Sequence, residues 1–358
     1  MINVTKTYLP KKAKYLKYVD RIFSSGWITN NGPMVKLLEK RLEKYLNVKN
    51  LILVSNGTLA LEIAYRALHL KGEVITSPFS FVATTSSIFS NGLKPIFADI
   101  DSDTLNINHS NIESKISNNT SAIVPVHVFG NACKIEEIDE IAKKHDLKVI
   151  YDAAHAFNVK FKNKSILLNG DISILSFHAT KIFHTIEGGA LIVNDESLVE
   201  KIRYLINFGI KNSEEIPELG TNAKMNEFSA AMGLCILDDI DLLNEKRKLI
   251  SELYTQKLSK KIIFPIQNED SSPNHSYFPI ILNNYEQLKL IEKTLNSTNI
   301  FPRRYFYPSL DTLDYINEKQ FCKISRDISS RILCLPMYPQ IDMKTVEQIC
   351  DIVNRCLC

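Results

Sequence analysis

The sequence has no long hydrophobic run and no apolar segment at its start. The first residues, MINVTKTYLPKKAKYLKYVD, lack the apolar core of a signal peptide, and no later segment approaches the ~18 consecutive apolar residues of a membrane span. We therefore expect a chain that is neither exported by that route nor embedded in a membrane.

The sequence also lacks a strong excess of either charge and a regular cysteine pattern. Its formal net charge of +3, from 43 basic and 40 acidic residues, gives no reason to expect nucleic acid or a membrane surface as a partner, and leaves a small acidic substrate possible. Seven cysteines lie scattered between Cys133 and Cys358 without a CxxC pair. This usage fits reduced thiols in the cytoplasm better than disulfides.

What is present is an alternation of short β-branched runs with amphipathic helical stretches. Alternation of this kind is typical of a largely parallel sheet covered by helices on both faces. The predicted strands are LILV (51–54), EVITSP (73–78), KPIFADI (94–100), SAIVPVHVF (121–129), LKVIYDA (147–153), ISILSF (172–177) and GALIVN (189–194).

The 358 residues are enough for two domains. The α/β pattern runs from about residue 25 to about residue 240 and ends in a long helical segment, MNEFSAAMGLCILDDIDLLNEKRKLISELYTQKL. We predict an N-terminal segment and a large α/β domain over residues 1–240, and a smaller α+β domain over residues 241–358.

The usual nucleotide-binding motifs are missing. No GxGxxG follows the first predicted strand and no GxxxxGK[ST] occurs, so the Rossmann dehydrogenase and P-loop interpretations lose most of their support. The first strand is followed by SNGTLALEIAYRAL, in which Gly57 allows a tight turn and Thr58 is a good N-cap. The backbone N–H groups at such a helix start can bind a phosphate, although a plain capped helix explains the same residues.

The run VIYDAAHAFN places Asp152 at the end of a predicted strand, at the sheet edge where α/β proteins bind ligands. A structural aspartate that caps a turn is an equal alternative, and His155 alone is a weak candidate. His178 and His184 are six residues apart, which does not align two ligands on one helix face, and no acidic or cysteine residue completes a set. We expect no metal site.

The stretch SFHATKIFHTIEGGA places Lys181 just after the strand ISILSF, so Lys181 and Asp152 should project from the same edge of the sheet. Pyridoxal 5'-phosphate needs a lysine for its Schiff base, an aspartate at its ring nitrogen and a phosphate-binding cup. A solvated lysine would explain Lys181 alone, but the combination favours this cofactor.

A family resemblance now becomes specific. The chain resembles the DegT-type nucleotide-sugar aminotransferases, which are pyridoxal-phosphate enzymes of the aspartate-aminotransferase (type I) fold. The resemblance covers residues 20–240 closely and the C-terminal part more loosely. It rests on GWITNNGPMVKLLEKRL, SNGTLAL, SPFSFVATTSSI, KPIFADID, PVHVFGNAC, YDAAHA, SFHATKIFHTIEGGALIVND and GTNAKMNEFSAAMGL, in that order.

The resemblance implies a role for each matching residue. Lys181 would bind the cofactor covalently and act as the catalytic residue, Asp152 would pair with the pyridine nitrogen, and the phosphate would be held by Gly57, Thr58 and Ser176.

Three further cofactor contacts follow from the same resemblance. Phe81 would stack on the ring, although a core aromatic side chain is an alternative. His155 would lie on the other side of the ring or near O3′. Asn222 would reach the cofactor phosphate of a partner subunit, so the resemblance implies a homodimer with shared active sites.

The presence of Lys181 also indicates the reaction. Some relatives carry histidine at this position and are dehydratases, so a lysine here implies transamination. The resemblance implies L-glutamate as donor and points first to TDP-4-keto-6-deoxyglucose as acceptor, giving the 4-amino product. A 3-amino product from a TDP-3-keto sugar and a UDP-linked acceptor are the alternatives.

Substrate contacts are expected in two segments. Trp27 and Thr29 lie in GWITN, and FPRRYFYPSL contains Arg303, Tyr305 and Tyr307. Arginine suits a diphosphate and aromatic rings suit a sugar or base face, although a packed surface loop explains the second segment almost equally well. A cofactor-binding regulator of the same fold is a weaker alternative, because no helix-turn-helix extension or basic face is present.

Overall fold

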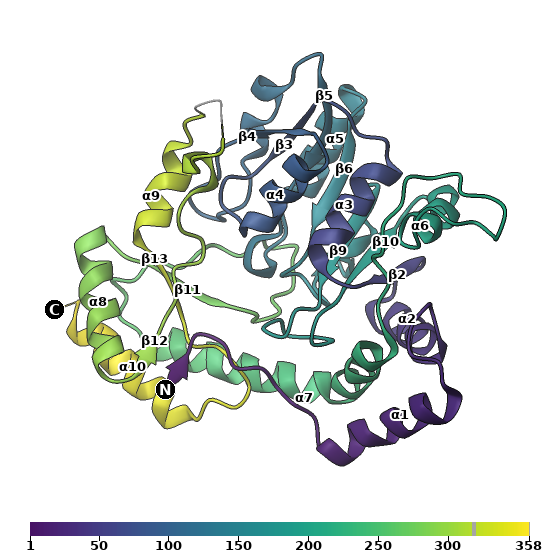
Figure 1. The fold of residues 1–358 in the computed structure, drawn as a ribbon. Coiled ribbons are helices and arrows are strands. Elements are labelled where there is room, and N and C mark those ends of the chain that lie inside the picture. Colours follow the sequence, from purple (N-terminus) through teal and green to yellow (C-terminus); the bar gives the residue numbers. More distant parts are fainter. Residues whose placement is uncertain (317–319, 358) are drawn as a thin grey trace.

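The computed structural model describes residues 1–316 and 320–357. Cys358, the last of the scattered cysteines, lies outside the described residues. A seven-stranded sheet forms the centre of the larger part (Figure 1). Its strands are β2 (Leu51–Val54), β3 (Glu73–Thr76), β4 (Lys94–Phe97), β5 (Thr120–Val124), β6 (Lys148–Asp152), β9 (Ile172–Ser176) and β10 (Gly189–Val193).

All seven predicted strands are present. Each lies within its predicted range except β5, which begins one residue earlier, at Thr120. The sheet order is β2-β10-β9-β6-β5-β3-β4. The pairs from β9 to β4 are parallel, whereas β10 runs antiparallel to both β9 and β2. The prediction of a mostly parallel sheet is confirmed.

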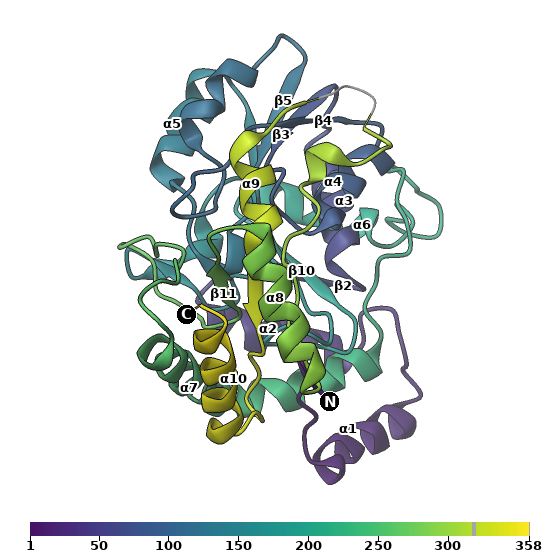
Figure 2. The same ribbon diagram turned by 90° about the vertical axis from the view of Figure 1, so that its left-hand side faces the viewer.

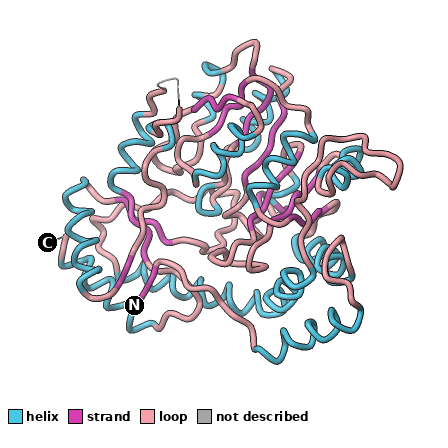
Figure 3. The backbone as a smooth tube through the Cα atoms, in the orientation of Figure 1, coloured by secondary structure: helices cyan, strands magenta, loops and turns pink. Residues whose placement is uncertain are grey.

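Helices cover both faces of this sheet, as Figure 3 shows. Side chains alternate along each strand, so Leu51 and Leu53 join one hydrophobic core while Ile52 and Val54 join the other. The first core also receives residues of α1 (Lys12–Ser25), α2 (Pro33–Leu46), α5 (Ile135–Lys144) and α7 (Glu227–Lys257); the second receives residues of α3 (Gly57–Ala67), α4 (Val82–Ser90) and α6 (Val199–Leu205). Burial on both faces explains why these strands read as continuous apolar runs.

Beyond the sheet, helix α7 leads into a C-terminal part with a hydrophobic core of its own. That core contains Ile250 and Tyr254 from the second half of α7, whereas Ile240 belongs to the core beneath the large sheet. The remaining elements of this part are β11 (Phe278–Ile281), α8 (Tyr285–Ser297), β12 (Ile300–Phe301), α9 (Lys323–Arg331), β13 (Ile332–Leu335) and α10 (Met343–Arg355). The division at residue 240 therefore falls inside a continuous helix, and the two-domain boundary stays a prediction.

The N-terminus lies beside the C-terminal part rather than beside the large sheet (Figure 2). Strand β1 (Ile2–Asn3) pairs in parallel with β12, and the Met337 N–H donates to the Val4 carbonyl at 2.9 Å. A small hairpin and several short 3₁₀ turns complete the described elements: β7 (Lys160–Phe161), β8 (Lys164–Ser165), His109–Asn111, Glu113–Lys115, Val128–Gly130, Ile166–Leu168, Glu196–Leu198 and Leu310–Thr312. Among the helices of residues 1–316 and 320–357, none combines the length and apolar character needed to cross a membrane.

Candidate active site

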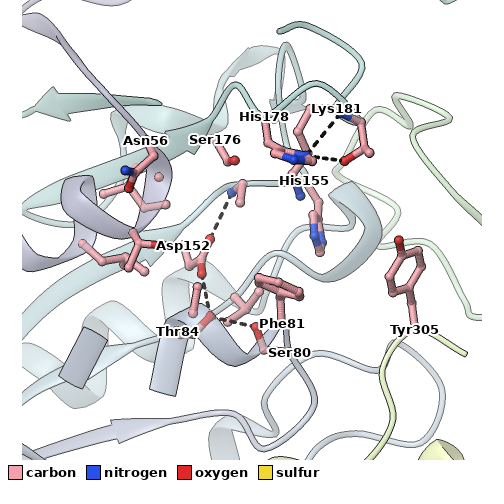
Figure 4. A pocket seen from close by; sticks show the side chains of 18 of the residues that line it. Asn56, Ser80, Phe81, Thr84, Asp152, His155, Ser176, His178, Lys181 and Tyr305 are labelled. Atoms are coloured by element: carbon pink, nitrogen blue, oxygen red, sulfur yellow. Dashed lines mark hydrogen bonds between the residues drawn. The ribbon is translucent and has the colours of Figure 1, made fainter. Parts of the chain in front are cut away.

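A cavity of about 290 Å³ opens at the edge of the sheet where parallel strands β6 and β9 end. It brings together nine of the residues predicted from the sequence: Gly57, Thr58, Phe81, Asp152, His155, Ser176, Lys181, Arg303 and Tyr305. Figure 4 shows six of them, Phe81, Asp152, His155, Ser176, Lys181 and Tyr305, around the cavity. One wall comes from the large sheet and its loops, and the other from the C-terminal part. The predicted convergence of Lys181 and Asp152 at one sheet edge is confirmed.

Lys181 lies in the loop between β9 and β10, where its backbone N–H donates to the His178 carbonyl at 2.9 Å. Its side chain keeps part of its surface open to the cavity. Burial lowers the pKa of Lys181 to about 8, and the attraction of Asp152 opposes that shift. At pH 7 about a tenth of this amine is therefore uncharged, far more than for a lysine of ordinary pKa, and the uncharged form is the one that acts as a nucleophile or a base.

Asp152 is fixed by donors from two directions. The Thr84 hydroxyl donates to Oδ2 at 2.7 Å, and the Ala154 N–H donates to Oδ1 at 3.1 Å. Burial raises the pKa of Asp152, while these two hydrogen bonds and the charge of Lys181 oppose the shift. Ser80 in turn bonds to Thr84 at 2.8 Å, so α4 supplies the support for a carboxylate carried by β6.

The start of helix α3 approaches the end of β9 very closely. A Cβ added to Gly57 would lie 2.9 Å from the Ser176 Cβ, which real Cβ atoms essentially never do. The expectation that Thr58 is the N-cap is wrong: Asn56 has extended backbone and its side chain accepts the Leu59 N–H at 2.8 Å. Gly57 is the first helical residue. Its lack of a side chain allows the start of α3 to lie close to Ser176, and it does not form a tight turn.

His155 is buried, and its ring is held by a hydrogen bond at its edge and by a stacked aromatic ring on its face. The Phe129 N–H donates to Nδ1 at 3.4 Å, and the ring stacks on Phe306 with centroids 5.5 Å apart. Nδ1 is thus the acceptor and Nε2 carries the proton. Burial lowers the pKa of His155 far below its usual value, and the charge of Lys181 adds to that shift, so the ring is neutral at pH 7.

Phe81 occupies the N-cap position of α4, and 52% of its surface is exposed. Its ring lines the cavity instead of joining a hydrophobic core, so the alternative of a core aromatic is wrong. An exposed aromatic ring at a cavity wall can stack on a planar ligand.

Four of the predicted site residues do not line this cavity. Trp27 and Thr29 are exposed between α1 and α2, and Tyr307 is exposed with Arg304 packed over its ring at 3.4 Å. Asn222 forms an isolated bridge with Asn207 outside the cavity. Their roles in binding stay predictions.

Several other polar and aromatic residues of the cavity were given no role there from the sequence: Asn56, Ser80, Thr84, His178, Glu187, Tyr277 and Phe306. His178 was considered only as a metal ligand, although it lies close to Lys181 in sequence. A buried carboxylate such as Asp152 requires hydroxyl donors, so Ser80 and Thr84 also had a local signal. Tyr277 and Phe306 had none, because they come from the other wall. His184 lies elsewhere, with Nε2 donating to the Tyr8 carbonyl at 2.7 Å.

A parallel sheet edge that joins a lysine, a buried carboxylate and a helix start is an arrangement that can bind a phosphorylated ligand beside a reactive amine. A solved structure of DesI in the presence of its TDP-sugar product superposes on this chain with a TM-score of 0.95 and 29% identity, over 99% of this chain and 92% of the other. The fold is thus that of the pyridoxal-phosphate sugar aminotransferases, which confirms the predicted fold class.

The family follows from the sequence comparison. The model of the DegT/DnrJ/EryC1/StrS aminotransferase family matches residues 10–354, so this chain belongs to that family and is an aminotransferase. It is 44% identical to a dTDP-4-amino-4,6-dideoxy-D-glucose transaminase of Shigella dysenteriae, over 99% of this chain and 98% of the relative. A transaminase of the same description from Escherichia coli is 39% identical over 97% of this chain and 96% of the relative.

Proposed function

We propose that this aminotransferase binds pyridoxal 5'-phosphate and moves an amino group from L-glutamate to a nucleotide-linked keto-6-deoxy sugar in the cytoplasm. The favoured acceptor is TDP-4-keto-6-deoxyglucose, which would become TDP-4-amino-4,6-dideoxyglucose. The observation that carries the proposal is the convergence of Lys181, Asp152 and the start of α3 on one cavity. The names of the Shigella and Escherichia relatives support the choice of sugar.

The donor set of the cavity fits this cofactor. The narrow gap between Gly57 and Ser176 leaves backbone N–H groups and two hydroxyls, those of Thr58 and Ser176, near one helix start, where a phosphate dianion is stabilised. The Asp152 carboxylate can keep a pyridine nitrogen protonated, and the exposed Phe81 ring can cover one face of a planar ring. Bound pyridoxal phosphate would supply an electron sink for the Cα–H bond of an amino donor.

The residues of this chain would then carry out the remaining work. Lys181, displaced by the substrate amine, would take the proton from the donor Cα and return it at C4′ of the cofactor. Neutral His155 would position the ring without adding a charge beside Lys181. Arg303 forms no ion pair among the described residues, so it is available to bind a diphosphate or a carboxylate.

We further propose that two copies share the active sites. Asn222 lies outside the cavity of its own chain, and Lys224 follows it with its ammonium 4.5 Å from the exposed Phe208 ring. The Asn222 amide and the Lys224 ammonium are both hydrogen-bond donors, so together they could bind the phosphate of a cofactor held by the other subunit. Sedimentation of the protein should give a dimer, and replacing Asn222 with alanine should weaken cofactor binding without changing that mass.

The proposal is tested by the absorption spectrum of the purified protein with pyridoxal phosphate. A visible band should form, disappear on addition of L-glutamate and return when one keto sugar is added, because the two half-reactions exchange the amino group in turn. A panel of TDP- and UDP-linked 4-keto and 3-keto sugars distinguishes the favoured acceptor from the alternatives. If the protein forms no visible band with added cofactor, the proposal is refuted. If the band returns only with a 3-keto sugar or a UDP-linked sugar, that sugar replaces TDP-4-keto-6-deoxyglucose as the acceptor.

A further inference from the structure

The loop that carries Lys181 joins β9 to β10, and most of it is buried behind the cavity. The four residues after the lysine, 182–185, are at most 7% exposed. The loop is closed at its base, where the Phe177 N–H donates to the Gly188 carbonyl at 2.8 Å and the Thr185 N–H donates to the Phe177 carbonyl at 3.0 Å. The position of Lys181 therefore depends on what the buried part of this loop contacts.

His184 lies in that buried part, and both of its ring nitrogens have partners. Nε2 is 2.7 Å from the Tyr8 carbonyl oxygen, and the Ile186 N–H donates to Nδ1 at 3.3 Å. Because a carbonyl only accepts and an N–H only donates, Nε2 carries the ring proton and Nδ1 carries none. Burial lowers the pKa of His184, which favours the same neutral form. One side chain thus joins the lysine loop to a residue 176 positions earlier in the chain.

The backbone that follows His184 is strained. Ile186 has a φ of 71°, in the left-handed region that a β-branched residue rarely adopts. Its side chain is 45% exposed, so the strain is not offset by burial of this residue. Strained backbone persists only where neighbouring contacts hold it, and the bond from the Ile186 N–H to the His184 ring is such a contact. A fixed His184 ring therefore also fixes the turn that ends the lysine loop.

The partner of His184 belongs to residues 4–11, here called the N-terminal strap, which runs from beside β12 past α7 to α1 (Figure 1). The Tyr8 hydroxyl donates to Asp239 Oδ2 on α7 at 3.1 Å, and the Lys14 ammonium donates to Oδ1 of the same carboxylate at 3.1 Å. The Tyr8 ring also packs against the hydrophobic core beneath the large sheet. The Tyr8 carbonyl is therefore presented to His184 from a fixed support.

The strap starts at the opposite wall of the cavity. It follows β1, which pairs with β12, and β12 leads directly into Arg303 and Tyr305 on that wall. One continuous segment thus extends from the strand that precedes Arg303 to the loop that carries Lys181. It is hydrogen-bonded to both sides of the cavity.

We propose that His184 is a positioning residue whose hydrogen bond to the Tyr8 carbonyl fixes the lysine loop to the N-terminal strap, and so sets Lys181 relative to the wall that carries Arg303. The inference rests on the proposed function, in which Lys181 and that wall must act on one bound substrate. His184 is not among the residues that line the cavity, so it acts through the loop.

Loss of this bond should change the surroundings of Lys181 in a measurable way. A loop released from the strap can move away from its buried position, and water then reaches the lysine amine more easily. Burial is the main cause of the low pKa of Lys181. Added water should therefore raise that pKa toward the ordinary lysine value of about 10.4.

The experiment uses the full-length protein without cofactor, so its readout does not depend on turnover. Cyanate carbamylates neutral amines only, and the pH dependence of carbamylation at Lys181, followed by peptide mass spectrometry, gives the pKa of this residue. His184→Asn removes the Nε2 donor while keeping an acceptor near the position of Nδ1, and it should raise that pKa by about one pH unit. His184→Gln places an amide N–H near the position of Nε2, which restores the bond to Tyr8, and it should raise the pKa by less than half as much.

A double variant tests the route from the strap to the lysine. Tyr8→Ala removes the ring and the hydroxyl that hold the strap, so it should also raise the pKa of Lys181. If the strap acts through His184, adding Tyr8→Ala to His184→Asn should give no larger shift than His184→Asn alone. Additive shifts would show that the two residues act independently, and they would overturn the inference.

The matched control is Thr76→Val, which removes a buried hydroxyl that donates to the Val124 carbonyl at 2.8 Å elsewhere in the same sheet. It should leave the pKa of Lys181 unchanged. Circular dichroism identifies the folded variants, and Tyr8→Ala keeps the inference testable if the His184 variants fail to fold. An unchanged pKa in folded His184→Asn or folded Tyr8→Ala overturns the inference, even if the wild-type enzyme transfers amino groups as proposed. A wild-type protein that forms no band with pyridoxal phosphate would refute the proposed function instead.

Discussion

The two walls of the cavity are built by different means. On the sheet wall, Asp152 ends β6, Ser176 ends β9 and Lys181 follows within five residues, and each is held by hydrogen bonds or close backbone contacts. On the opposite wall, Tyr277, Tyr305 and Phe306 come from the C-terminal part and are held mainly by ring packing.

Under the proposed function, this difference would separate chemistry from recognition. Strand ends fix a lysine and a carboxylate within a rigid frame, which would suit catalysis. Rings and an arginine on connecting segments can change identity without disturbing the sheet, which suits a wall that selects one sugar among related ones. Changes on the sheet wall should therefore reduce the rate, and changes on the other wall should alter substrate affinity.

The largest effect is expected for Lys181→Ala. Without the amine, neither covalent attachment nor proton transfer is available, and turnover should fall by at least about a thousandfold. Release of 2-oxoglutarate from L-glutamate in the presence of the keto sugar measures it. Lys164→Ala, an exposed lysine on β8, is the control and should behave like wild type. A Lys181→Ala enzyme of native rate would remove this residue from the mechanism.

Asp152→Asn should follow, with a loss of about a hundredfold in kcat, because under the proposed function the group that would face the cofactor nitrogen no longer carries a charge. The attraction of Asp152 raises the pKa of Lys181, so its removal should lower that pKa below about 8 in the cofactor-free protein. Cyanate labelling of Lys181 measures the shift. Exposed Asp146→Asn is the control, and a Lys181 pKa that rises instead would contradict the electrostatic description of the site.

A different kind of defect is expected for Arg303→Gln. The KM for the keto sugar should rise about tenfold or more, since a charge-assisted contact to the diphosphate is lost, while the cofactor spectrum stays as in wild type. Steady-state kinetics separate the two parameters. If kcat fell and KM did not change, the contrast between the two walls would fail.

The smallest effect is expected for Gly57→Ala. The added Cβ would lie 2.9 Å from the Ser176 Cβ, so the start of α3 must shift. We expect a cost of about 1 kcal/mol in cofactor affinity, roughly fivefold, from this overpacking. Equilibrium dialysis with pyridoxal phosphate measures it, with Ser176→Ala as the variant that removes a hydroxyl without adding bulk. Unchanged affinity for Gly57→Ala would place the phosphate elsewhere.

The sequence predicted the sheet wall well and the other wall poorly, for a physical reason. Strand runs such as LILV are buried on both faces, so their composition reveals them, and residues that end neighbouring parallel strands must meet at one edge. Lys181 and Asp152 could be placed together on that ground alone.

The contacts that were missed depend on tertiary packing or on fine backbone geometry. Tyr277 meets Lys181 across 96 residues, and nothing in its neighbourhood NHSYFPI distinguishes it from a strand residue. The choice of Asn56 over Thr58 as N-cap was set by extended backbone at Asn56, which the sequence does not reveal.

The pairing of β1 with β12 has a consequence for how the protein is made. During synthesis Ile2 leaves the ribosome long before its partner Ile300 exists, so the first strand must wait unpaired while the large sheet forms. The C-terminal core is then completed by a strand that was synthesised well before the rest of that core. Substitutions that weaken the pairing of Ile2 with Ile300 should therefore slow the last step of folding and leave the formation of the large sheet unchanged.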